Sequence, residues 1–183
     1  AKVLGSIDFS PYLASDADGD AGFGFDGDFS HLYVTALGSQ TSGGRITEAA
    51  GVAGLIADGA LTGGARIVDV NDGTYVENVV VGKALRLLGS NAGIDPNVGP
   101  RGVETIVDAG GSGDVIAVFA DDVEIDGFKL QNGGTGVYVE ASNDVEILNN
   151  IITDVQFAAF YDSAGDGSNT GGVVDNNLIE NLT

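Results

Sequence analysis

Five aspartates in one glycine-rich segment have the type and spacing best suited to metal binding. They are Asp16, Asp18, Asp20, Asp26 and Asp28. Ca²⁺ takes about six to eight oxygen ligands, and alternate carboxylates around a glycine can wrap such a cation. An EF-hand loop starting at the first aspartate would need a bidentate Glu where this chain has Gly27. The segment therefore predicts a calcium site with an incomplete motif, and a plain solvated loop is the alternative. Asp162 and Asp166 form a weaker second candidate.

Glu124 and Glu146 are the residues that would suit glycoside hydrolysis. That reaction uses two carboxyl groups about 5–10 Å apart, one of which has a raised pKa. The two glutamates occupy equivalent positions in similar segments, so stacked strands would hold them about 5 Å apart on an outer face. Columns of charge are common on such faces, however, and the sequence gives no sign of a cleft.

The basic residues do not complete a catalytic site. Lyase or esterase chemistry would need a cation beside the carboxylates, whereas the cations of this region are scattered along the chain. They are Arg66, Lys83, Arg86, Arg101 and Lys129. His31 is the single histidine, which leaves no plausible Ser-His-Asp triad. We therefore predict that the chain is not an enzyme.

The charge balance excludes several classes of partner. The chain has 7 Lys and Arg against 27 Asp and Glu, a net charge of −20. Nucleic acids and anionic membrane surfaces require clustered cations, and acidic polysaccharides would be repelled unless cations bridged them. No run approaches the ~20 apolar residues of a membrane span, and the absence of cysteine excludes disulfides. We expect a secreted or cell-surface protein in a medium whose salt screens self-repulsion.

Three segments in the second half of the chain can be aligned with one another. They begin at Asp122, Asp144 and Gly171, at offsets of 22 and 27 residues. The alignment gives one column of Ile125, Ile147 and Val174, and another of Leu130, Ile152 and Ile179; a weaker copy at residues 84–89 adds Leu87 to the first. Apolar residues alternate within each copy, which is the period of a strand. Units too short to bury their own apolar face stack on their neighbours, so the pattern predicts an all-β parallel solenoid.

Two features of composition agree with stacked strands. The chain has 30 Gly, no Trp and no Met, which favours thin layers of Val, Ile, Leu and Ala joined by turns. The pairs Asn149-Asn150 and Asn176-Asn177 fall in register, so we predict an internal asparagine ladder rather than a ligand site. Tyr75 is interpreted as turn packing and Glu77 as a solvent-facing charge.

The first third of the chain differs from the repeats. Residues 1–40 are predicted to form an N-terminal extension, with strands around Val3 to Phe9 and around Leu32 and Val34, joined by the Asp/Gly-rich loop. Apolar residues then recur every three or four positions over about 45–60, which predicts an amphipathic helix. We interpret this helix as a cap on the first coil of a solenoid domain covering residues 41–183.

The run Asp72-Gly-Thr-Tyr-Val-Glu-Asn78, with Leu85-Arg-Leu-Leu-Gly89 and the Ile147-Leu-Asn-Asn-Ile-Ile152 type of coil, resembles the right-handed parallel β-helix proteins of the pectin-lyase-like superfamily. The likeness covers residues 45–183. The segment Ile7 to Ser30 resembles the region between repeats in very large bacterial surface proteins of this kind. The resemblance implies a right-handed parallel β-helix. It does not decide function, because the superfamily includes polysaccharide lyases, esterases and hydrolases as well as adhesins and structural repeats.

Two classes of function follow from the sequence. The first is an extracellular structural protein whose last coil docks on the N-terminal region of the next copy, giving a head-to-tail filament or surface array that calcium would stabilise. The alternative is a carbohydrate-binding or polysaccharide-degrading β-helix. About five coils rising about 4.8 Å each give a stack only about 24 Å tall, which is short for a groove that holds several sugar units. We therefore favour the structural class.

Overall fold

The computed structural model describes residues 31–36, 44–53, 66–163 and 169–183. The predicted calcium ligands Asp16 to Asp28, the predicted strand Val3 to Phe9 and Asp166 lie outside these residues. Thirteen strands and one helix make up the described part of the chain. In chain order they are β1 (His31–Val34), α1 (Arg45–Val52), β2 (Ile67–Val70), β3 (Gly73–Val76), β4 (Val79–Val81), β5 (Leu85–Leu88), β6 (Thr105–Asp108), β7 (Asp114–Val118), β8 (Val123–Asp126), β9 (Phe128–Glu140), β10 (Glu146–Leu148), β11 (Ile151–Asp162), β12 (Val173–Asp175) and β13 (Leu178–Glu180).

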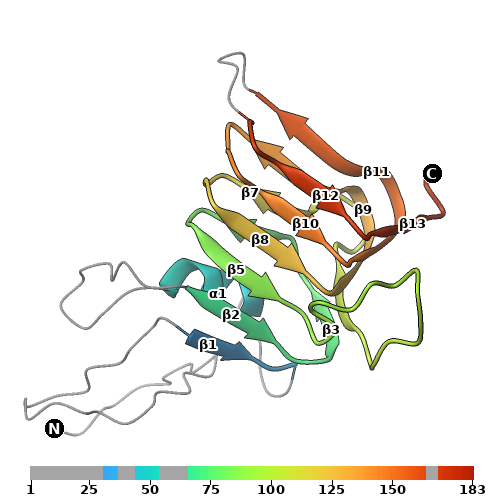
Figure 1. The fold of residues 1–183 in the computed structure, drawn as a ribbon. Coiled ribbons are helices and arrows are strands. Elements are labelled where there is room, and N and C mark those ends of the chain that lie inside the picture. Colours follow the sequence, from blue (N-terminus) through green and yellow to red (C-terminus); the bar gives the residue numbers. More distant parts are fainter. Residues whose placement is uncertain (1–30, 37–43, 54–65, 164–168) are drawn as a thin grey trace, which may run out of the picture.

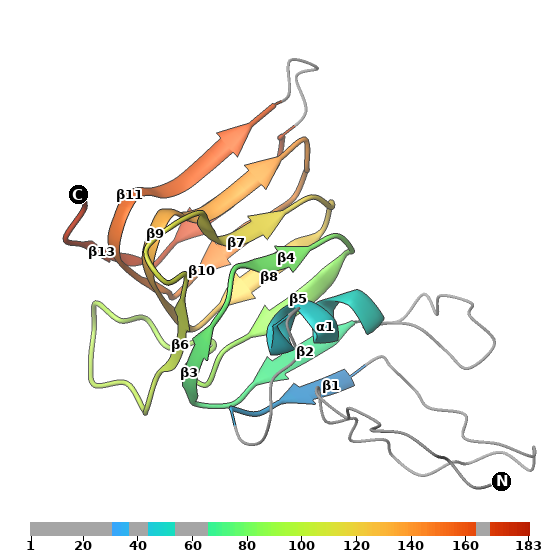
Figure 2. The same ribbon diagram turned by 180° about the vertical axis from the view of Figure 1, so that it is seen from behind.

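The strands form two parallel sheets. The first sheet has the order β1-β2-β5-β8-β10-β12, and the second has β13-β11-β9-β6-β3, with β7 pairing both β4 and β9. Every strand pair among the described residues is parallel. From β8 onward the chain alternates between the sheets, so each new layer lies on the previous one (Figures 1 and 2). The prediction of an all-β fold with parallel strands is confirmed; the right-handed β-helix remains a prediction.

The core consists of apolar columns that run across the strands. Pairing places Leu32, Val68, Leu87, Ile125, Ile147 and Val174 in one column of the first sheet. In the second sheet Val107, Leu130, Ile152 and Ile179 form another. The sequence alignment predicts Leu87, Ile125, Ile147 and Val174 in the first column and Leu130, Ile152 and Ile179 in the second, and the structure adds Leu32, Val68 and Val107. Side chains from both sheets join in one buried cluster, because alternate residues of each strand point to the same side.

Two strands are longer than the sequence pattern indicates. β9 has 13 residues and β11 has 12, where short strands separated by turns were expected. The first part of β9 pairs with β6 and the last part with β7, so one strand serves two neighbours. Gly133 lies at the change of partner, where an added Cβ would stand 2.8 Å from a methyl of Val115. The bend in β9 therefore needs glycine at this close approach.

Helix α1 covers one end of the core. Its residues Ile46, Ala49 and Ala50 are buried, and it contacts β1, β2 and β4. The helix ends at Val52, since Ala53 has an extended ψ of 132°, and residues 54–60 of the predicted range of about 45–60 lie outside the described residues. Gly51 and Gly54 flank that point, and glycine costs about 1 kcal/mol in a helix interior.

Glu77 is a helix cap rather than a solvent-facing charge, so that part of the sequence interpretation is wrong. The residue is 8% exposed. Its Oε1 accepts the backbone N–H groups of Arg45 and Ile46 at 3.0 and 3.1 Å, and its Oε2 accepts that of Thr47 at 3.2 Å. A carboxylate from the bend between β3 and β4 thus satisfies the first amides of α1, which its own Gly44 cannot do.

Tyr75 is fully part of the core, at 1% exposure. Its hydroxyl donates to the carbonyl of Asn71 at 3.0 Å and lies 3.4 Å from that of Val34. Burial raises the pKa of this phenol to about 12. The Gly-Thr-Tyr-Val-Glu run therefore points Tyr75 and Glu77 inward. Tyr75 fills the core, and Glu77 bonds to the first turn of α1.

Candidate functional site

The two glutamates considered for hydrolysis lie side by side as predicted, and one of them is paired with an arginine. Glu124 and Glu146 are register partners on β8 and β10. Arg86 on β5 is the next residue in the column, and its Nε and Nη2 donate to the Glu124 carboxylate at 2.5 and 2.9 Å. The hydrogen bond to Glu124 raises the pKa of Arg86. Both oxygens of the Glu124 carboxylate therefore accept from the guanidinium of Arg86.

The surroundings of that column are an open acidic hollow. Asp122, Asp144 and Glu146 line it together with the Arg86–Glu124 pair. Among the described residues no group of three or more His, Cys, Asp or Glu side chains is arranged to hold a metal ion. The hollow therefore supplies neither a cation cage nor an enclosed reaction site.

The predicted asparagine ladder is present for Asn150 and Asn177, whereas the Asn149 side chain donates to Asp126 instead. The Asn150 side chain is fully buried; its Oδ1 accepts the Phe128 N–H at 2.9 Å and its Nδ2 donates to the Ile125 carbonyl at 3.0 Å. One layer on, Asn177 repeats this arrangement, because its Oδ1 accepts the Asn150 N–H at 2.8 Å and its Nδ2 donates to the Ile147 carbonyl at 2.7 Å. The side-chain amides of Asn150 and Asn177 therefore bond to the backbone and to each other.

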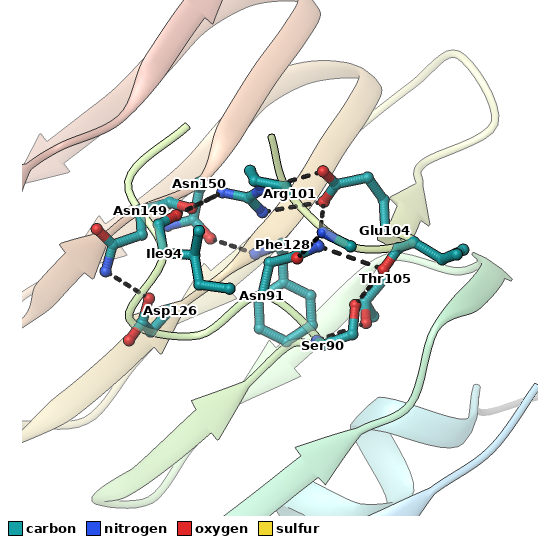
Figure 3. Close-up of polar contacts among 12 residues, drawn as sticks. Ser90, Asn91, Ile94, Arg101, Glu104, Thr105, Asp126, Phe128, Asn149 and Asn150 are labelled. Atoms are coloured by element: carbon teal, nitrogen blue, oxygen red, sulfur yellow. Dashed lines mark hydrogen bonds and ion pairs between the residues drawn. The ribbon is translucent and has the colours of Figure 1, made fainter. Parts of the chain in front are cut away.

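The loop of residues 89–104, between β5 and β6, folds over the outside of these turns (Figure 3). Arg101 is its centre: Nε and Nη2 donate to the Glu104 carboxylate at 3.0 and 2.9 Å, and Nη1 donates to the carbonyls of Ile94 and Asn149. Asn91, 1% exposed, donates to Glu104 and accepts the Gly102 N–H. The charged groups of this loop are paired internally, which identifies it as a structural clamp.

The clamp crosses three successive turns. The Asp126 carboxylate accepts the Gly93 N–H at 3.0 Å and the Asn149 amide at 2.8 Å, and Asn97 reaches the carbonyl of Asn176 at 3.4 Å. Sequence analysis did not predict this role. A signal was available, since Arg101 is one of only seven cations and lies in a loop that is otherwise polar and Pro-containing.

An aromatic row lies on the outer side of the second sheet. Its members are Phe119, Tyr138, Phe157 and Phe160. Tyr138 and Phe160 are register partners with stacked rings 5.9 Å apart, and Phe119 and Phe157 meet this pair edge-on at 6.4 and 5.8 Å. The three phenylalanines are between 43% and 53% exposed, which is unusual for adjacent aromatic side chains.

Carboxylates lie at one edge of the aromatic row. The Tyr138 hydroxyl lies 3.1 Å from Asp162 Oδ2 and 3.4 Å from Glu140 Oε2. Partial burial, together with the hydrogen bond and charge of Asp162, raises the pKa of Tyr138 to about 12. The phenol therefore stays protonated and acts as a hydrogen-bond donor at neutral pH.

The last layer of strands is open, in contrast to the buried layers before it. Ile147 and Ile152 are 0% exposed, whereas Val174 and Ile179, the next residues in their columns, are 48% and 45% exposed. Leu182 is 54% exposed beside them. Within the described residues β13 pairs only with Ile151 to Thr153, so the second half of β11 has no strand on the side away from β9. These residues are the exposed ends of the two apolar columns among the described residues.

Comparison of the chain with family models, with curated proteins and with solved structures found no match. The resemblance to the pectin-lyase-like superfamily therefore stays a sequence-based prediction. In the described part of the chain, no helix has the length and apolar character needed to cross a membrane.

Proposed function

We propose that this chain is a right-handed parallel β-helix unit of an extracellular structural protein, and that it stacks end to end with copies of itself into a filament or surface array. The open layer at β12 and β13 carries the proposal. Val174 and Ile179 continue columns that are completely buried in the layers beneath. Another layer laid on them in the same register would bury them in the same way.

The exposed apolar side chains would contribute to association. Complete burial of a Val, Ile or Leu side chain contributes roughly 1.5–3 kcal/mol, and Val174, Ile179 and Leu182 are about half exposed, so each would contribute about half of that. Among the described residues, β12 pairs with β10 alone, and no strand pairs with the second half of β11 on the side away from β9. A parallel sheet edge of this kind is a template for further strands.

Charge and composition support an extracellular setting. A net charge of −20 on 183 residues keeps monomers apart at low ionic strength and lets salt control association. The sequence-predicted calcium ligands Asp16 to Asp28 would supply a second, cation-dependent control. Neither property suits a partner such as nucleic acid.

Replacing the exposed core positions tests this function. Val174→Lys with Ile179→Lys should abolish assembly of the purified chain in sedimentation velocity and electron microscopy, because two ammonium groups would enter the contact. Val76→Lys with Val80→Lys is the matched control, since both valines are exposed on other strands at 63% and 44%. Assembly that survives the first pair, or a wild-type chain that stays monomeric in physiological salt, would contradict the proposal.

Carbohydrate binding is a second candidate, and the aromatic row is the observation that favours it. Exposed rings beside the Tyr138 hydroxyl, Glu140 and Asp162 offer both apolar faces and polar groups. The acidic chain would select neutral sugars. Affinity electrophoresis through gels containing soluble β-glucan or mannan tests this candidate. Retardation of wild type that is lost in Phe157→Ala with Phe160→Ala would support it, and equal migration of both proteins would contradict it.

A further inference from the structure

We infer that the aromatic row on the second sheet binds a polymer of protonated amino sugar. The rings of Phe119, Tyr138, Phe157 and Phe160 pack against the sugar, and the carboxylates beside the row bind its ammonium groups. The inference rests on the carbohydrate candidate above and narrows it, because it takes a cationic sugar in place of a neutral one. It does not depend on end-to-end stacking.

The row lies on the outer face of the sheet and not at a strand edge. β9 lies between β7 and β11, and β7 itself lies between β4 and β9 (Figure 2). The register places Ala117, Tyr138 and Phe160 in one column across β7, β9 and β11. Phe119 directly follows β7, an inner strand, and is 48% exposed. The exposure of this face is therefore a property of inner strands as well as of β11.

The rings form a continuous apolar strip that crosses the strands. The Tyr138 and Phe160 rings are nearly parallel, at 9°, with their centroids 5.9 Å apart. Phe119 extends the strip towards β7, and Phe157 widens it along β11. Neighbouring strands lie about 4.8 Å apart, so the strip offers a ring at each step across the strands β7, β9 and β11. Such a strip suits an extended ligand with repeating apolar faces.

The charge beside the row is negative. The Tyr138 hydroxyl donates to Asp162 Oδ2 at 3.1 Å and lies 3.4 Å from Glu140 Oε2, which brings two carboxylates to one edge of the ring pair. Lys129 is the last cation in the sequence, and eight Asp or Glu follow it between residues 130 and 183. Aromatic faces and carboxylates both attract a cation. A positively charged ligand is therefore complementary to this surface, and an acidic one is repelled.

The face of a sheet favours a glycan over a basic peptide. Peptides that bind a sheet commonly pair their backbone with an exposed strand edge. Here the backbone of β9 already pairs with β7 on one side and with β11 on the other, so the face presents side chains alone. A sugar ring needs no backbone partner. Its C–H groups can pack on the aromatic faces while its ammonium group reaches a carboxylate.

Isothermal titration calorimetry with three probes tests the inference. The first probe is an oligomer of β-linked glucosamine at mildly acidic pH, where its amino groups are protonated. The second is the N-acetylated oligomer of the same length, which is neutral. The third is an oligolysine of the same charge. The wild-type chain should bind the glucosamine oligomer about tenfold more tightly than either of the others, because only this oligomer offers both sugar faces and ammonium groups.

Two double variants separate the rings from the carboxylates. Phe157→Ala with Phe160→Ala should lose binding of the glucosamine oligomer. Glu140→Gln with Asp162→Asn keeps the rings and should lose the preference for the charged oligomer, so that both sugars bind equally. Asp175→Asn with Glu180→Gln is the matched control. It removes the same two charges from exposed positions on β12 and β13, and the preference should remain.

Each contrary outcome overturns a different claim. Equal binding of the two sugars by wild type, lost when the phenylalanines are replaced, overturns the amino-sugar inference and leaves the carbohydrate candidate standing. Binding of neither sugar overturns both. Oligolysine bound as tightly as the glucosamine oligomer shows a site for basic peptides instead. A preference that the control variant loses as completely as Glu140→Gln with Asp162→Asn assigns it to the overall charge of the chain and contradicts a site at the aromatic row.

Discussion

At the scale of single residues, the turns explain why the chain is rich in Asn, Asp and Gly. Nine of the described non-glycine residues have positive φ, and eight of them are Asn or Asp. These residues occupy equivalent turns in successive layers. Gly127, Asn149 and Asn176 have positive φ at one turn, and Asn132, Asp154 and Asn181 have it at another. Short polar side chains tolerate this left-handed conformation and bond to nearby backbone. Each turn can therefore stack on the previous one without strain.

Ala141 is the exception in this set, with a φ of 47° and an exposed side chain. An L-residue other than Gly, Asn or Asp loses roughly 1–2 kcal/mol in this region. Ala141→Asn should raise the free energy of unfolding by about 1 kcal/mol, measured by urea denaturation. Ala141→Val at the same position should lower it, because a β-branched side chain is worse there. Equal stability of the two variants would contradict the strain.

In the asparagine ladder, we predict that replacing Asn150 lowers the free energy of unfolding more than replacing Asn177. Asn150→Ala leaves the Phe128 N–H and the Ile125 carbonyl buried without partners, which should cost about 2–4 kcal/mol since each unsatisfied group costs roughly 1–3 kcal/mol. Asn177→Ala makes the same change where the side chain is half-buried and water can substitute, so a loss of about 1 kcal/mol is expected. Denaturation midpoints measure both, and a larger loss for Asn177→Ala would be inconsistent with the ladder.

We predict that the contribution of Tyr138 to the free energy of unfolding is lost at alkaline pH. Partial burial and Asp162 raise its pKa to about 12, above the ordinary value of 10 in the unfolded chain. The unfolded state therefore ionises first, so the contribution of this phenol is complete below pH 10 and is lost as the pH rises through about 12. Asp162→Asn should lower the pKa of Tyr138 and shrink this loss. NMR titration of labelled tyrosine measures the shift, and an unchanged pKa in the variant would disprove the contact with Asp162.

At the scale of elements, the sequence predicts the features that repeat in every layer, such as the apolar columns. It does not predict the features that occur once. Ile125, Ile147 and Val174 could be aligned because every layer places an apolar residue at the same point. The cap made by Glu77 could not, because its partner amides are about 30 residues away and no local pattern joins them. The C-terminal end of α1 and the merging of short strands into β9 were missed for the same reason, since tertiary neighbours decide both.

The clamp over residues 89–104 gives a prediction with a matched control. Gly127 has a φ of 81°, and a Cβ there would lie 2.1 Å from the backbone nitrogen of Ala92 in the clamp. Gly110 has a similar φ of 70° with nothing within 4 Å. Gly110→Ala should cost about 1–2 kcal/mol from strain alone. Gly127→Ala should cost several kcal/mol more, because the clamp must also move.

Thermal denaturation and hydrogen exchange of the clamp amides measure that difference. The Gly102 N–H, which the Asn91 side chain accepts, is a suitable reporter. Similar losses for the two glycine variants would show that the clamp is not packed against this turn. Faster exchange of the clamp in Gly127→Ala, with Gly110→Ala unchanged, is the expected pattern.

At the scale of the whole molecule, net charge and the open end act against each other. In the proposed assembly, burial of Val174 and Ile179 would favour association, whereas a charge of −20 on each copy would oppose it. The Debye length falls from about 30 Å at 0.01 M salt to about 3 Å at 1 M, so added salt removes most of the repulsion and little of the apolar attraction. Association should therefore be weakest in dilute buffer and increase with NaCl.

Calcium at matched ionic strength separates screening from binding. If Asp16, Asp18 and Asp20 help to hold Ca²⁺, as the sequence predicts, CaCl₂ should promote assembly at lower ionic strength than NaCl, and MgCl₂ should be less effective because Mg²⁺ dehydrates reluctantly. The combined variant Asp16→Asn, Asp18→Asn, Asp20→Asn should remove the calcium advantage while keeping the response to NaCl. Light scattering against ionic strength measures all three salts. Identical curves for CaCl₂ and MgCl₂ in the wild-type chain would mean that divalent charge alone acts, and a calcium advantage that persists in the variant would place the cation elsewhere on the acidic surface.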